Sequence, residues 1–134
     1  GLSQADIDAM DGEWRAQVGA ADAPAIEPVL NNAAADFLRA RVDESGGVIT
    51  EAFTMDAHGL NVSATAVTSD MWQGDEAKFT ETYARGAGAT HLSEVEFDES
   101  TQTYQGQISV TVTDPATGTP IGALTVGVDA EALM

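Results

Sequence analysis

The chain has 134 residues, and its 22 Asp and Glu residues against five Lys and Arg residues give a formal net charge of −17. Such a surface repels nucleic-acid phosphates and anionic lipid headgroups, so no nucleic acid and no anionic membrane surface is expected as a partner. There is no cysteine, which excludes disulfide bonds and thiolate metal sites. The length predicts one domain with a single buried core over residues 1–134.

A capping pattern opens the first predicted helix, which covers residues 4–18. The Ser3 hydroxyl is placed to accept a hydrogen bond from a helix N–H, and the Asp6 carboxylate lies at the positive end of the helix. Four apolar residues recur at helical spacing and need a partner surface: Ile7, Met10, Trp14 and Val18. This helix is therefore a candidate contact for a homodimer.

A second helix is predicted over residues 24–42. Pro24 suits a first helical turn, and the apolar residues that follow keep the helical spacing without a break. The two helices make up an N-terminal region of residues 1–47. No apolar run approaches the roughly 20 residues that cross a bilayer, and the first residues form neither a basic nor an apolar leader. We therefore expect any signal peptide or anchoring helix to have been removed before this chain.

From residue 48 onward the hydrophobic period changes from about 3.6 residues to about two, which indicates strands. A turn at residues 56–59 joins the first two strands, and Gly86 ends a helix predicted over residues 75–85. The predicted strands cover residues 48–55, 60–67, 90–98, 104–113 and 120–129. Residues 48–134 thus form an α+β core, with a five-stranded antiparallel sheet, helices packed on one face, and the last three strands in a meander.

Several segments resemble those of a known family. Asp70-Met-Trp-Gln-Gly-Asp-Glu-Ala-Lys78 resembles the Asp-x-Trp-x-Gly-Asp-Glu segment of some Cache sensors, and Phe97-Asp98 and Ile121–Asp129 look like the closing strands of that family. The element order over residues 24–134 is similar to the PAS-like core of bacterial single Cache domains. The resemblance implies a loop-helix lid over the sheet. It also implies a periplasmic or extracellular sensor domain, usually of a membrane-anchored histidine kinase, chemoreceptor or cyclase.

Two aromatic residues of the lid are candidate ligand contacts. Tyr83 shares one face of the predicted lid helix with Glu76 and Phe79, and Trp72 joins that face if the helical turn starts there. We expect the two rings to enclose a ligand over the sheet, because a tryptophan in a loop loses solvation unless it covers something. The alternative is that the stripe only packs into the core, which aromatic residues at this spacing commonly do.

Scarce cations and a polar strand face supply the remaining candidates. Lys78, Arg85 and His91 fall within fourteen positions of an acidic chain, where an anionic ligand needs local positive charge. Ser109, between Gln107 and Thr111 on one strand face, would orient a carboxylate or hydroxyl if that face looks toward the lid. One alternative is that Lys78 and Arg85 only complement neighbouring acids and the helix C-terminus. His91 would then be an exposed edge residue, and the polar strand face would be ordinary surface.

The sequence therefore predicts a ligand-binding sensor domain for a small metabolite, a carboxylate or amino acid, in signal transduction. The alternative is a stand-alone periplasmic binding or scaffold module whose pocket is filled by its own side chains. No nucleophile-base motif is present, so neither an enzyme nor a cofactor is expected. The acidic groups around Asp56, Asp70, Asp75 and Asp98 lack the spacing of an EF-hand, so no metal is expected.

Overall fold

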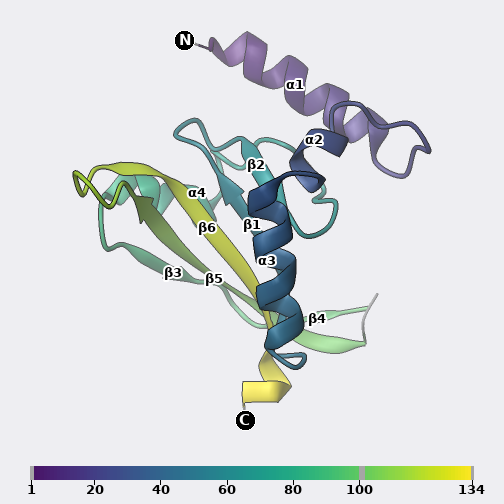
Figure 1. Cartoon of the computed structure of the whole chain (residues 1–134), viewed down its shortest axis with the longest axis vertical. Helices are drawn as coiled ribbons and strands as arrows, with labels where there is room; N and C mark the ends of the chain where they lie inside the picture. The colour runs from purple at the N-terminus through teal and green to yellow at the C-terminus, as the bar shows by residue number, and fades with distance from the viewer. Residues whose placement is uncertain (1, 100–101, 134) are drawn as a thin grey trace.

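The computed structural model describes residues 2–99 and 102–133, and it places an antiparallel sheet between helices (Figure 1). The helices are α1 (Gln4–Gln17), α2 (Glu27–Leu30), α3 (Ala33–Glu44) and α4 (Ala77–Thr80), with short 3-10 helices η1 (Tyr83–Arg85) and η2 (Ala130–Leu133). The strands are β1 (Ile49–Met55), β2 (Asn61–Ala64), β3 (Thr90–Leu92), β4 (Glu96–Asp98), β5 (Thr103–Thr113) and β6 (Pro120–Asp129). Within the described ranges, every helix is too short or too polar to cross a membrane.

The sheet confirms the predicted α+β class and the meander of the last strands, with six strands in place of five. The strand order is β2-β1-β6-β5-β3, and β4 also pairs with β5. The single strand predicted over residues 90–98 is divided into β3 and β4. Between them, the Ser93 N–H donates to the Gln107 carbonyl (2.9 Å), and the Ser93 hydroxyl accepts from the Gln107 N–H (2.8 Å). The side chain of Ser93 thus takes a backbone donor that a neighbouring strand would otherwise bond.

The strand register determines which side chains share a face. Phe53 of β1 lies opposite Thr125 of β6, Thr125 lies opposite Ser109 of β5, and Ser109 lies opposite His91 of β3. The ammonium of Lys78, a residue of α4, lies over the Phe53 ring, so all four strand residues face the lid. Figure 1 shows α3 in front of the sheet and α4 behind it. The expectation that helices cover one face is therefore wrong, because the two helices pack on opposite faces.

The predicted helix over residues 24–42 is wrong in one respect, because it breaks into α2 and α3 at Asn32. The Asn32 side-chain oxygen accepts from the Ala35 N–H (2.8 Å), which starts α3. Its Nδ2 donates to the carbonyls of Pro28 (2.8 Å) and Val62 (3.1 Å), so the same side chain also closes α2 and attaches it to β2. Helical spacing of apolar residues continues across this break, which hides it from a reading of the sequence.

The lid helix is also shorter than the predicted residues 75–85. It ends after Thr80 because Thr82, which is fully buried, turns its hydroxyl back to the Lys78 carbonyl (2.6 Å). Thr82 itself has a φ of −119° and a ψ of −86°, outside the helical region. The chain resumes as η1, so the lid is a loop with two short helical turns.

Two of the four residues in the apolar stripe predicted for α1 are buried inside the domain. Trp14 is fully buried in the main core, beside Phe53 and Phe79, and Ile7 is also buried. The predicted capping box is confirmed by reciprocal bonds between Ser3 and Asp6, at 3.1 Å each. The residues proposed for dimer contact therefore find much of their partner surface in their own domain, and a homodimer stays a prediction.

Candidate ligand-binding site

Backbone contacts at two glycines hold the lid loop, residues 65–76, against the β1–β2 hairpin. The Gln73 N–H donates to the Gly59 carbonyl (2.8 Å), and Gly59 has a φ of +86°, which favours glycine. A Cβ at Gly59 would lie 2.5 Å from the Gly74 Cα, and a Cβ at Gly74 would lie 2.3 Å from the Trp72 indole nitrogen. Only glycine at these positions lets the two segments meet, and their contact fixes the loop over the sheet.

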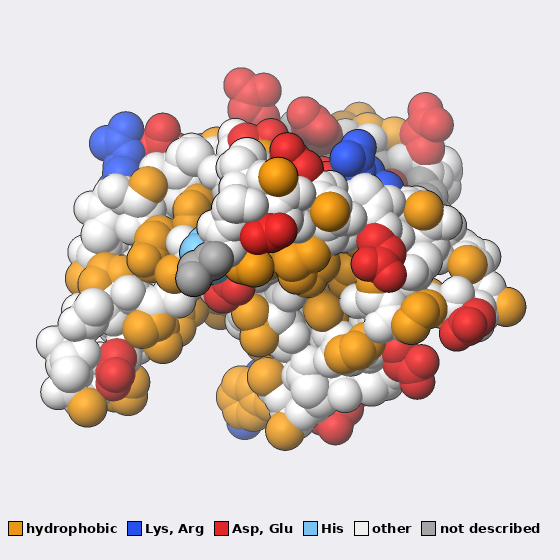
Figure 2. Space-filling model, turned by 90° about the horizontal axis from the view of Figure 1, so that it is seen from above, with side chains coloured by type: hydrophobic (Ala, Val, Ile, Leu, Met, Phe, Trp, Pro, Cys, Tyr) orange, Lys and Arg blue, Asp and Glu red, His pale blue; other side chains and the backbone are white. Residues whose placement is uncertain are grey.

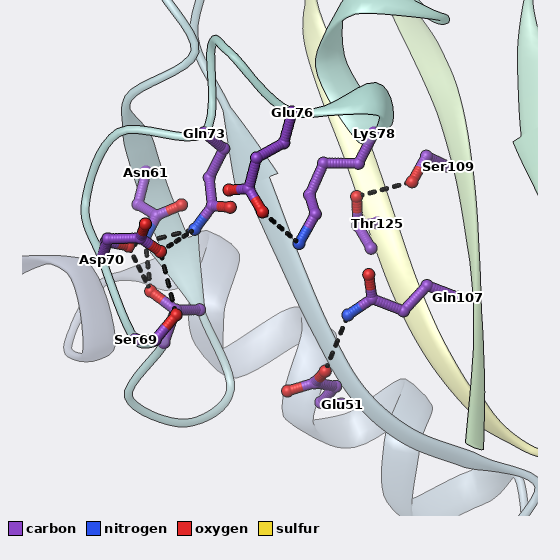
Figure 3. A network of polar contacts seen from close by, with 11 residues as sticks. Glu51, Asn61, Ser69, Asp70, Gln73, Glu76, Lys78, Gln107, Ser109 and Thr125 are labelled. Atoms are coloured by element: carbon purple, nitrogen blue, oxygen red, sulfur yellow. Dashed lines mark hydrogen bonds and ion pairs between the residues drawn. The ribbon is translucent and has the colours of Figure 1, made fainter. Parts of the chain in front are cut away.

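A cavity of about 160 Å³, here called the lid pocket, lies between the lid loop and the strands. Its lining combines residues of β1, the lid loop, α4 and β5: Glu51, Phe53, Val67, Thr68, Ser69, Gln73, Lys78 and Gln107. Figure 3 shows Gln73 and Lys78 on the lid side, directed toward Asp70 and Glu76, and Gln107 beside Glu51 on the strands. The lining is therefore mostly polar, with one cation and one carboxylate.

The cation of the lid pocket is held by an aromatic ring and a distant carboxylate. The Lys78 Nζ lies 5.3 Å from the centroid of the Phe53 ring and 3.8 Å from Glu76 Oε1, and its side chain is 17% exposed. Both the ring face and the carboxylate attract the ammonium electrostatically. An ammonium carries three N–H donors, so donors remain for a bound group.

Two buried amide side chains have oxygen atoms without a hydrogen-bond partner among the described residues. The Gln73 Nε2 donates to the Asp70 carbonyl (3.0 Å), and the Asn61 Nδ2 donates to Thr68 Oγ1 (2.6 Å) and to the same carbonyl (3.1 Å). Because the Asp70 carbonyl only accepts, each amide must face it with its nitrogen, which leaves the amide oxygens unbonded. Gln73 is 2% exposed and lines the lid pocket, so its Oε1 is placed to accept a hydrogen bond from a molecule in the pocket.

Burial raises the pKa of the Glu76 carboxyl above its ordinary value. The charges of Asp70 and Asp75 raise this pKa further, whereas the Lys78 ammonium lowers it, and burial outweighs that attraction. One of the two carboxyl oxygens, Oε2, is buried without a partner in the described structure. Glu76 is therefore a further acceptor near the pocket.

This shift predicts how stability depends on pH. The folded protein keeps the Glu76 proton to a higher pH than the unfolded chain does, so the free energy of unfolding falls as pH rises through the interval between the two pKa values. Glu76→Gln cannot ionise and escapes this loss. We expect its melting temperature relative to the wild type to be higher at about pH 7 than at about pH 4, measured by circular dichroism. An equal difference at both pH values would contradict the expectation.

Three of the six predicted site residues face the lid side of the sheet or the pocket. Lys78 lines the lid pocket. Ser109 and His91 lie opposite each other on the lid face, so the polar face of β5 looks toward the lid and not to open solvent. Ser109 is fully buried, with its hydroxyl 2.8 Å from Thr125 Oγ1, and neither residue belongs to the pocket lining.

The other three predicted residues lie outside the lining of the lid pocket. The Trp72 indole N–H donates to the His58 carbonyl (2.9 Å), so this ring fastens the lid loop to the hairpin turn. The Tyr83 ring stacks on Phe79, with centroids 5.1 Å apart, and packs against the core. Arg85 is exposed and its Nε lies 2.6 Å from Glu81 Oε2.

Gln73 is one of the pocket residues that sequence reasoning missed. It lies between Trp72 and Gly74, inside the segment that carries the family resemblance, but glutamine in a polar loop carries no sign of burial. Glu51 was missed for a similar reason, because its place on the lid face depends on the register of β1 with β6. The position of Gln73 between Trp72 and Gly74 was the available sign that it belongs to the pocket.

Comparisons with known proteins show the fold. No protein-family model and no curated protein sequence matches the chain. Solved structures do match, among them the sensor domain of the V. cholerae histidine kinase DctB, with a TM-score of 0.55 and 10% sequence identity. The ligand-binding domain of the Pseudomonas aeruginosa amino acid chemoreceptor PctC in complex with GABA matches with a TM-score of 0.58 and 15% identity. The sensory domain of the Campylobacter jejuni chemoreceptor Tlp3 with isoleucine bound matches with a TM-score of 0.54 and 12% identity. They cover 95%, 94% and 97% of this chain, which spans only 45%, 53% and 53% of theirs.

The chain therefore has the fold of these sensor domains, the Cache-type fold that the sequence predicted. It corresponds to about half the length of the solved domains that it matches. At such low identity the likeness carries the fold and leaves the ligand to be argued from the pocket.

Proposed function

We propose that this chain is the ligand-binding part of an extracytoplasmic bacterial receptor, and that it binds a small zwitterion such as an amino acid in the lid pocket. One observation carries the proposal: a poorly exposed ammonium, Lys78, and an unpartnered buried oxygen, Gln73 Oε1, line one small cavity. The ammonium suits a carboxylate, and the oxygen suits an ammonium. The PctC and Tlp3 structures with GABA and isoleucine support the same class of ligand.

The roles of the pocket residues follow from their donors and acceptors. Lys78 would hold the ligand carboxylate, and Gln73 together with Glu76 would accept hydrogen bonds from the ligand ammonium. A carboxylate without an amino group would leave Gln73 Oε1 unbonded, which costs binding free energy. Gln107 of β5 would contact the ligand from the sheet side.

Asp11 and Trp14 connect α1 with the lid loop and suggest how binding would be signalled. The Asp11 Oδ1 accepts from the N–H groups of Met71 (2.9 Å) and Trp72 (3.0 Å), and the Trp14 indole N–H donates to the Thr68 carbonyl (2.9 Å). Because Thr68 lines the pocket, a shift of the lid loop would move α1 with it. The size of the response is limited by the difference in ligand affinity between the shifted and the unshifted arrangement of the lid loop and α1.

The receptor would be a membrane-anchored signalling protein of which this domain faces the periplasm or the exterior. Its matched domains come from histidine kinases and chemoreceptors, which supports that assembly. A homodimer through α1 belongs to the same proposal, and Val18, which is 46% exposed, is the residue of its apolar stripe that stays open to a partner.

Calorimetric titration with an amino-acid panel tests the proposal. Lys78→Met should weaken the binding of any amino acid that binds the wild type by about tenfold or more, the scale of one charge-assisted hydrogen bond. Arg85→Met is the matched control: it removes the same charge from the same lid, but from an exposed side chain, and should leave affinity unchanged.

Two results would overturn the proposal. If no amino acid binds to the folded wild type, the domain is better described as a binding or scaffold module without such a ligand. If Lys78→Met and Arg85→Met weaken binding equally, the cation acts through the general field of the lid, and the pocket assignment fails.

A further inference from the structure

A larger acidic groove of about 530 Å³ adjoins the lid pocket, with which it shares lining residues. Four carboxylates line it: Glu51, Glu94, Glu96 and Asp98, together with the amides Gln105 and Gln107. These residues come from β1, from β4 and the segment before it, and from β5. No lysine, arginine or histidine is among the lining residues.

The glutamates of this groove have no basic partner in the described structure. All five Lys and Arg residues are described, and each pairs with an acid elsewhere: Arg15–Asp11, Arg39–Asp36, Arg41–Glu44, Lys78–Glu76 and Arg85–Glu81. Acidic side chains are also spread over the face seen from above α1 (Figure 2). Like charges lining a concave surface concentrate negative potential, so the groove attracts cations.

The groove and the lid pocket share two residues, Glu51 and Gln107. The Gln107 Nε2 donates to Glu51 Oε1 (3.3 Å), so this pair lies at the junction of the two spaces (Figure 3). The unpartnered oxygen of Gln73 lies on the pocket side of this junction, and Gln73 is only 2% exposed. A molecule that satisfies Gln73 can therefore extend past Gln107 into the groove.

We propose that the ligand is a basic amino acid, with its zwitterionic head in the lid pocket and its cationic side chain along the acidic groove. This inference rests on the proposed function and adds the charge of the ligand side chain to it. Lys78 takes the carboxylate and Gln73 the α-ammonium, while Glu51, Glu94 and Glu96 surround the terminal ammonium or guanidinium. Lys78 lies in the lid pocket, whereas Glu94 and Glu96 lie in the groove. This separation of charge sets the direction in which the ligand lies.

The distribution of the carboxylates favours a chain-like organic cation. They line an extended groove, and within the described part of the chain no three Asp, Glu or His side chains lie close enough together to hold a metal ion. A flexible alkylammonium or guanidinium chain meets separate carboxylates along its length, whereas a metal ion needs them at one point.

Calorimetric titration of the purified domain with L-lysine, L-arginine and L-norleucine tests the inference. Norleucine keeps the amino-acid head and the alkyl chain but lacks the terminal ammonium. We expect lysine or arginine to bind at least about tenfold more tightly than norleucine, and the preference to weaken as salt is added. The double variant Glu94→Gln/Glu96→Gln should reduce this preference, bringing the affinities for lysine and arginine closer to that for norleucine.

A second double variant, Glu27→Gln/Glu131→Gln, is the matched control. It removes two charges from exposed positions outside the groove and should keep the preference. If norleucine binds as tightly as lysine, or if both double variants reduce the preference equally, the inference is overturned while the proposed amino-acid site stands. If none of the three amino acids binds, both fail. If Ca²⁺ alone binds and Glu94→Gln/Glu96→Gln abolishes it, the groove is a metal site and the inference is overturned.

Discussion

Trp14→Ala is expected to destabilise the domain by about 3–5 kcal/mol, because Trp14 is the largest of the fully buried side chains and its removal leaves a cavity. The substitution also removes the indole N–H that donates to the Thr68 carbonyl at 2.9 Å. For a domain of this length such a loss lowers the melting temperature by roughly 10 °C or more. Thermal and urea unfolding, followed by circular dichroism, measure the effect.

Val18→Ala, at the C-cap of α1, is the control. Val18 is 46% exposed at the end of α1, so its truncation should change stability by less than about 0.5 kcal/mol. Trp14→Phe should lie between the two, because it keeps most of the packing and loses the hydrogen bond. If Trp14→Ala melts within about 2 °C of the wild type, α1 does not pack on the core as described.

Gly122→Ala is expected to cost about 3 kcal/mol or more, because β6 passes β1 too closely for a side chain at this point. A Cβ at Gly122 would lie 2.1 Å from the Met55 carbonyl oxygen and 3.2 Å from the Met55 carbonyl carbon, both backbone atoms that cannot rotate away. To admit the methyl group, β1 and β6 must separate where Met55 pairs with Ala123. Urea unfolding midpoints of the variant and the wild type measure the cost.

Gly106→Ala separates this steric effect from the general effect of replacing a buried strand glycine. A Cβ at Gly106 would meet only the Val95 and Val128 methyl groups, at 3.6 and 3.8 Å, which are ordinary contacts. We expect this variant to stay within about 1 kcal/mol of the wild type. Equal midpoints for the two variants would show that β1 and β6 do not approach as closely as described.

Local patterns determined much of the fold. The order of helices and strands and the Ser3–Asp6 cap depend on residues close together in the chain, and both are confirmed. The sequence did not reveal the breaks at Asn32, Thr82 and Ser93. In each case a polar side chain bonds to a backbone group, and the spacing of apolar residues does not register such a bond.

The ligand site depended on tertiary structure to a greater degree. The sequence alone determined that basic residues are few and that one of them, Lys78, is a candidate for the pocket. Only the fold decided that Gln73 is buried with an unbonded oxygen. The fold also decided that the five Lys and Arg residues pair with acids other than Glu94 and Glu96. Burial and pairing depend on neighbours that lie far apart in the chain, as Glu51 and Gln107 do. For that reason composition pointed to an anionic or zwitterionic ligand, whereas the folded chain adds an acidic groove beside the pocket.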